Sequence, residues 1–119
     1  MLRDDIYEIT ASGTDGGVFV YRVSLLPESA VYAAHFKGMP VTPGACLLQM
    51  AAELASMASG RKLEVEAASD IRFLHPVSPG DISCLEFRLE PDAADPARWN
   101  VQALSGETLC ARMKLSMRQ

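Results

Sequence analysis

Residues 42–60 read TPGACLLQMAAELASMASG, and this stretch decides the fold. Thr42 followed by Pro43 is typical of a helix start, with Thr42 as the N-cap and Pro43 in the first helical position, and Gly60 is typical of a helix end. Apolar side chains go most of the way round the predicted helix, so the helix must be buried. It has one narrow polar stripe, which needs hydrogen-bonding partners and consists of Gln49, Glu53 and Ser56.

Strand patterns lie on both sides of this helix. Two β-rich runs, residues 6–11 and 18–25, flank Thr14-Asp15-Gly16-Gly17, which suits a tight hairpin. After the helix, apolar and polar residues alternate with a period of two, and turn sequences divide them into about four strands. These runs cover residues 63–74, 83–89, 99–103 and 109–117. One antiparallel sheet wrapped around one long central helix is the economical packing, which predicts a single α+β domain over residues 1–119.

The composition is that of a globular protein, with 49% hydrophobic and 22% charged residues. The net charge of −4 argues against general affinity for nucleic acid or for an anionic membrane, because both require a positive field. No stretch approaches the roughly 20 apolar residues that span a bilayer, and the first residues do not resemble a signal peptide. The sequence therefore predicts a cytoplasmic protein that binds neither nucleic acid nor membrane.

The three cysteines are odd in number and show no paired or metal-ligand spacing. We expect Cys46, Cys84 and Cys110 to be reduced and largely buried. No metal ion and no diffusible cofactor is expected.

Two segments resemble one family. Residues 35–44, HFKGMPVTPG, resemble the signature of β-hydroxyacyl-acyl-carrier-protein dehydratases, with His35 and the Pro43-Gly44 pair in register. Residues 71–81, IRFLHPVSPGD, resemble the segment that leads into a later strand of the same family. The resemblance implies a hotdog fold, with the sheet wrapped around the helix, and a homodimer or higher homo-oligomer whose sites are each built from two subunits.

The resemblance also implies a reaction, the loss of water from a 3-hydroxyacyl thioester on a phosphopantetheine arm of acyl carrier protein or coenzyme A. His35 would be the base, because imidazole titrates near neutral pH. The Gly44 backbone N–H at the helix start would stabilise the charge that develops on the thioester oxygen. The other substrate-binding residues that the signature implies are Phe36, Pro43 and Ala45. By contrast, a surface or structural role is expected for His75, which has no such motif.

One position departs from the family. The family has a carboxylate on the central helix fourteen residues after the histidine, and this chain has Gln49 there and Glu53 one turn later. An amide cannot deliver a proton near neutral pH. The acid for the leaving hydroxyl would then be His35 itself or Glu53 acting through water. Structural roles remain open for both residues, with Gln49 orienting substrate or bonding across an interface and Glu53 satisfied by an arginine or a backbone N–H.

Three functions follow from these residues. The first is a dehydratase, or the reverse hydratase, that acts on acyl thioesters. The second is a hotdog acyl-thioesterase, although this class usually relies on a helix carboxylate, which Gln49 replaces. The third is a catalytically degenerate partner subunit that binds acyl chains or pairs with an active homologue. His35 and Gly44 favour the first.

Overall fold

The computed structural model describes residues 2–26, 42–78 and 81–119. In these residues, two strands precede a helix and four strands follow it, which confirms the predicted order. Their bounds are β1 (Tyr7–Asp15), β2 (Val18–Leu25), α2 (Gly44–Ser59), β3 (Glu64–Phe73), β4 (Cys84–Pro91), β5 (Arg98–Ser105) and β6 (Thr108–Arg118).

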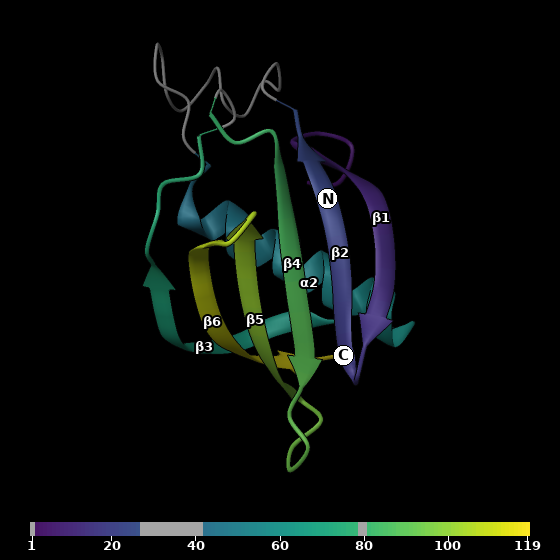
Figure 1. The fold of residues 1–119 in the computed structure, drawn as a ribbon. Helices are drawn as coiled ribbons and strands as arrows, with labels where there is room; N and C mark the ends of the chain where they lie inside the picture. The colour runs from purple at the N-terminus through teal and green to yellow at the C-terminus, as the bar shows by residue number, and fades with distance from the viewer. Residues whose placement is uncertain (1, 27–41, 79–80) are drawn as a thin grey trace.

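The strands form one sheet in the order β1-β2-β4-β5-β6-β3, and every neighbouring pair is antiparallel. Figure 1 shows the sheet curving around α2, which crosses behind the strands. The predicted antiparallel sheet around one long helix is therefore confirmed. The hairpin is also as predicted, because Gly16 and Gly17 adopt φ of 55° and 88° between the paired Asp15 and Val18.

The core lies between α2 and the sheet. Alternate residues of β4, β5 and β6 turn toward the helix, so that Phe87, Val101 and Leu115 are almost fully buried. Met50 and Leu54 of α2 are completely buried against them. The predicted burial of the helix is confirmed for the face that packs on the sheet. It does not extend all round the helix, because Met57 near the helix end is 38% exposed.

The helix begins one residue later than its sequence predicts. Pro43 occupies the cap position with φ −59° and ψ 147°, and no side chain caps the helix. Thr42 as N-cap was wrong, because the extended ψ of Pro43 moves the helix start to Gly44. Thr42 is buried, and its N–H donates to the Val77 carbonyl at 2.7 Å. In the part of the chain that the structure describes, no helix is long and apolar enough to cross a bilayer.

Strand β3 alternates apolar and polar residues as expected, but it has no buried face. It lies at the edge of the sheet beyond β6, and every residue from Glu64 to Phe73 is exposed. Its pairing with β6 is irregular in two places, and Asp70 has a positive φ of 48°. The alternating pattern was correct for a strand, but within the described part of one protomer β3 stays exposed along its whole length, and only its last residue, Phe73, lies against the start of α2.

The cysteines are free, as expected. Cys110 is buried and Cys46 is half-buried, but Cys84 is exposed. The expectation of burial was wrong for Cys84 because Leu85 faces the core, and neighbouring residues of a strand point to opposite faces.

Candidate active site

The first turn of α2 offers unpaired backbone donors. The N–H groups of Cys46 and Leu47 donate to the Pro43 carbonyl at 2.9 and 3.2 Å. Among the described residues, no acceptor takes the N–H of Gly44 or of Ala45. The helix macrodipole adds partial positive charge at this end. The helix start can therefore bind a carbonyl oxygen that acquires negative charge.

Gly44 lies directly under an aromatic ring. A Cβ at this position would come within 2.5 and 2.7 Å of two ring atoms of Phe73, which ends strand β3. Only glycine permits this close approach without displacing the ring. Phe73 is itself 52% exposed, so an apolar surface borders the N–H groups that have no partner among the described residues.

The polar stripe of α2 has the partners that a buried helix requires. Glu53 is only 5% exposed. Its Oε2 accepts the Leu2 N–H at 2.8 Å and the Gln49 amide at 3.0 Å, and its Oε1 accepts the Arg3 N–H at 3.0 Å and the Tyr7 hydroxyl at 2.9 Å. The Ser56 hydroxyl accepts the Leu63 N–H and donates to the Leu63 carbonyl, just after the helix ends. The carboxylate therefore ties the N-terminal segment to the central helix.

These contacts keep Glu53 ionised. Burial by itself raises the pKa of Glu53, but the hydrogen bonds from Leu2, Gln49, Tyr7 and Arg3 together outweigh it and hold the pKa below its ordinary value. Burial and the bond to Glu53 raise the pKa of Tyr7, so its hydroxyl stays protonated and donates. A carboxylate with a lowered pKa and four donors carries no proton near neutral pH.

The predicted site residues fall into three groups. His35 and Phe36 lie outside the described residues. Glu53 points toward the N-terminal segment. The third group lies on the first turns of α2 or just before it, at exposed or half-buried positions, and consists of Pro43, Gly44, Ala45 and Gln49.

A backbone N–H as partner of Glu53 was one of the alternatives expected from the sequence, and Leu2 and Arg3 supply two, but the individual partners were not predicted. Leu2, Arg3 and Tyr7 hold Glu53, and Phe73 covers Gly44. No local pattern could have revealed them, because each partner is 29 to 51 residues away along the chain. The expected surface role of His75 agrees with its exposed ring, whose Nδ1 lies 2.9 Å from the Pro76 carbonyl oxygen.

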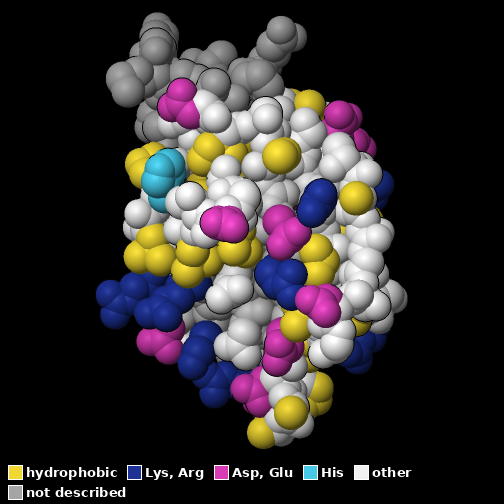
Figure 2. All heavy atoms as spheres, in the orientation of Figure 1, with side chains coloured by type: hydrophobic (Ala, Val, Ile, Leu, Met, Phe, Trp, Pro, Cys, Tyr) yellow, Lys and Arg dark blue, Asp and Glu magenta, His cyan; other side chains and the backbone are white. Residues whose placement is uncertain are grey.

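At the helix start, in the described part of one protomer, Gly44 is half-buried and Ala45 and Gln49 are exposed. A hollow of about 580 Å³ lies elsewhere, on the outer face of the sheet, where its lining includes Arg88, Gln102 and Arg112. Figure 2 looks onto this outer face, which carries interspersed Lys, Arg, Asp and Glu side chains. A closed pocket at Gly44 and Gln49 thus requires more than these residues of one chain.

Similar proteins fit this geometry. Residues 11–114 match the ApeI-like family, described as ApeI dehydratase. The 3-hydroxyacyl-[acyl-carrier-protein] dehydratase FabZ of Variovorax paradoxus is 31% identical over 100 residues, which cover 74% of this chain and 67% of that protein. FabZ of Chlamydia trachomatis is 30% identical over 94 residues, which cover 71% of this chain and 61% of that protein. The chain thus spans about two thirds of the length of these relatives, or somewhat less.

Solved structures share the fold at low identity. The dehydratase heterocomplex ApeI:P from Xenorhabdus doucetiae superimposes with a TM-score of 0.79 at 12% identity, over 93% of this chain and 96% of that one. A putative thioesterase, yhdA from Lactococcus lactis, gives a TM-score of 0.66 at 16% identity, over 98% and 94%. These likenesses show the hotdog fold. Because the family match runs from strand β1 into strand β6, the chain belongs to the ApeI-like dehydratase family.

Proposed function

We propose that the protein removes water from 3-hydroxyacyl thioesters carried on phosphopantetheine. The observation that carries this proposal is the helix start, where Gly44 presents an N–H without a partner among the described residues, nine residues after His35 in the family signature. The FabZ relatives act on 3-hydroxyacyl chains of the acyl carrier protein, according to their names, which supports the same substrate class here. We expect a single domain over residues 1–119 that works in the cytoplasm without metal or cofactor.

The reaction needs a base and an oxyanion donor. His35 takes the proton from the carbon beside the thioester carbonyl, while the Gly44 N–H stabilises the negative charge that develops on the carbonyl oxygen. The bond between the third carbon and its hydroxyl oxygen then breaks, and the electron pair of the lost C–H bond forms the double bond. The leaving hydroxyl takes a proton and departs as water. The product is the 2-enoyl thioester.

The same histidine is the best source of the second proton. Gln49 occupies the family's acid position but has no acidic proton. Glu53 accepts four hydrogen bonds and has a lowered pKa, so it has no proton to give near neutral pH. After the first step His35 is an imidazolium, and it can return its proton to the leaving hydroxyl.

A second copy of the chain is proposed to complete the site along β3. Among the described residues no strand pairs with the outer edge of β3, and its exposed apolar side chains are Val65, Ile71, Phe73 and the following Leu74. Phe73 also contacts the Gly44 position, so a copy packed on β3 would border the helix start. A symmetric homodimer therefore covers the exposed strand and encloses the site.

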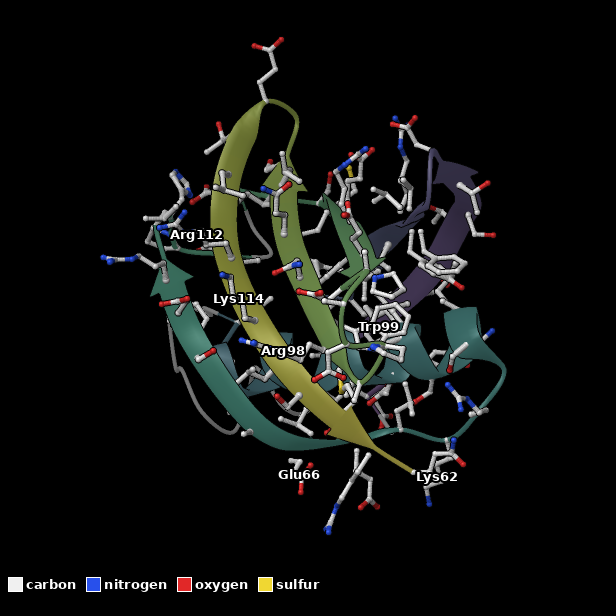
Figure 3. All side chains as sticks on the ribbon, turned by 90° about the horizontal axis from the view of Figure 1, so that it is seen from below. Lys62, Glu66, Arg98, Trp99, Arg112 and Lys114 are labelled. Carbon is white, nitrogen blue, oxygen red and sulfur yellow. The ribbon has the colours of Figure 1, made fainter. Side chains whose placement is uncertain are left out.

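Basic side chains near this edge favour a carrier protein over coenzyme A alone. Arg72 of β3 and Arg112 of β6 are directly opposite in the ladder, and neither has an ion-pair partner among the described residues. Like charges opposite each other are unfavourable, and an acidic partner would relieve the repulsion. Figure 2 shows Lys and Arg gathered toward the β3 and β6 side, and Figure 3 shows Arg112 and Lys114 along β6, with Arg98 of the neighbouring strand β5 beyond them.

Spectroscopy with defined thioesters tests the proposal. The protein is incubated with 3-hydroxybutyryl and crotonyl thioesters of pantetheine and of an acyl carrier protein, and both enoyl absorbance and free thiol are followed. A change in enoyl absorbance without free thiol supports dehydration. Release of thiol would instead identify a thioesterase, and binding without either change would identify a degenerate acyl-binding subunit.

A further inference from the structure

The side-chain amide of Gln49 is held in one of its two orientations. Its nitrogen lies 3.0 Å from Oε2 of Glu53. The same carboxylate oxygen accepts the Leu2 N–H, and the second oxygen accepts the Arg3 N–H and the Tyr7 hydroxyl. An ionised carboxylate only accepts hydrogen bonds. The half of the Gln49 amide that faces Glu53 must therefore be the NH₂ group.

The opposite half of the amide is then a carbonyl oxygen, Oε1. Gln49 is exposed on α2, and among the described residues no donor bonds Oε1. A carbonyl oxygen accepts hydrogen bonds and never donates one. At the position where the family carries an acid, this chain thus presents a fixed acceptor to whatever binds along the polar stripe.

We propose that Gln49 selects acyl chains that carry a hydrogen-bond donor on the third carbon, and that Glu53 is the positioning residue that holds the Gln49 amide in this orientation. The inference rests on the proposed function, which brings a 3-hydroxyacyl thioester to α2. The 3-hydroxyl donates its hydrogen to Oε1 and is thereby oriented for elimination. A 3-oxo group has no hydrogen to donate, so two carbonyl oxygens would face each other.

The burial of Glu53 makes this selection rigid. A carboxylate that is 5% exposed and accepts four hydrogen bonds has no room to rotate, so the amide has no second partner arrangement of equal energy. A site that hydrogen-bonds a substrate hydroxyl discriminates against analogues that lack it, because the polar group of the site is left unpaired.

Binding of three unreactive analogues tests the selection. The probes are the 3-hydroxybutyryl, butyryl and 3-oxobutyryl amides of pantetheine, in which nitrogen replaces the thioester sulfur and makes the carbon beside the carbonyl less acidic. Calorimetry gives the dissociation constant of each amide. We expect the 3-hydroxybutyryl amide to bind about tenfold more tightly than the butyryl amide, which is the value of one net hydrogen bond, and the 3-oxobutyryl amide to bind most weakly.

Three variants separate selection from stability. Gln49→Met keeps the side-chain length at an exposed position but removes the acceptor, so the affinity ratio of the hydroxyl and butyryl amides should fall to about one. Glu53→Gln lets the Gln49 amide turn over, so the affinity ratio of the hydroxyl and butyryl amides should fall to a value between those of the wild type and Gln49→Met. Tyr7→Phe is the matched control, because it removes another donor to Glu53 while the Gln49 contact remains, and it should keep the wild-type ratio even if the fold is less stable.

The outcomes distinguish a failure of the selection by Gln49 from a failure of the proposed dehydratase function. Equal affinity of the wild type for all three amides would overturn the selection and leave the proposed function standing. No binding of any amide would overturn the proposed function and the selection with it. A wild-type ratio in Gln49→Met would remove Gln49 from recognition. A ratio that falls as far in Tyr7→Phe as in Glu53→Gln would reduce Glu53 to a structural residue.

Discussion

His35 is the side chain on which the proposed elimination most depends. His35→Ala should lower the dehydration rate by about 10²- to 10⁴-fold, because it removes the positioned acid and base together. The measurement is kcat for the 3-hydroxybutyryl thioester, with circular dichroism to show an intact fold. His75→Ala is the matched control, since His75 is an exposed histidine and should keep full activity. Wild-type turnover in His35→Ala would remove this residue from the mechanism.

Gln49→Glu tests whether the missing acid limits the rate. The new carboxyl would stand where an amide nitrogen now lies 3.0 Å from Glu53 Oε2. Two carboxylates this close cannot both be ionised, so one retains a proton and can serve as an acid. We expect kcat for dehydration to rise by about tenfold or more.

In Gln49→Glu, kcat should fall as the pH rises and the proton shared by the two carboxylates is lost. The wild type has no such proton, so its pH profile should lack this decrease. Gln49→Met, which has similar length and no proton to give, should show no such rise. An unchanged kcat in Gln49→Glu would mean that proton supply to the leaving hydroxyl does not limit turnover.

At the scale of elements, the Glu53 network joins the N-terminal segment to α2 and makes stability depend on pH. The folded pKa of Glu53 lies below its ordinary value of 4.5. The carboxylate therefore stabilises the fold fully above about pH 4.5, and this stabilisation is lost as the pH falls through the lower folded pKa. Glu53→Gln should lower the free energy of unfolding by about 2 to 3 kcal/mol at neutral pH.

Urea unfolding of wild type and variant from neutral pH downward checks this expectation. The difference in the free energy of unfolding between them should narrow as the solution becomes acidic. Glu107→Gln, in the exposed turn between β5 and β6, is the control and should change little at any pH. A constant difference across the pH range would show that Glu53 is not ionised in the folded state.

A second contact between elements, β3 against the start of α2, constrains Gly44. In Gly44→Val the new Cβ would meet the Phe73 ring at 2.5 Å, so the ring must swing away while the added branches crowd the thioester. We expect kcat for dehydration to fall by about 10²-fold. The folded state should be little destabilised, because Phe73 is half exposed and its ring can move aside. Turnover near that of the wild type would contradict a thioester bound against Gly44.

At the scale of the whole molecule, the exposed edge predicts that the protein works as a dimer. Ile71→Asp puts a charge on the uncovered apolar strand, and it should shift the mass in light scattering from twice 12.9 kDa toward 12.9 kDa and lower activity in parallel. Ser12→Asp on β1, the opposite edge strand, should leave both unchanged. A wild type that is already monomeric and active would contradict a site built from two copies.

The sequence by itself determined the elements and their order. The period of two in the strands, the apolar helix that ends at Gly60 and the two glycines of the hairpin are local features, and local backbone preferences express them in the predicted places. The family resemblance, and the hotdog fold that it implies, followed from two motifs that are each about ten residues long. The stripe of Gln49, Glu53 and Ser56 was also visible, together with its need for partners.

Only the tertiary structure decided what that stripe binds and which surfaces stay open. Glu53 meets donors that lie 46 to 51 residues earlier, and no period in the chain predicts a contact at such a separation. The exposure of β3 depends on its place at the edge of the sheet, a property of strand order rather than of its alternating residues. Likewise, Gly44 is confined by Phe73 because the sheet folds back over the helix start, which a local pattern does not encode.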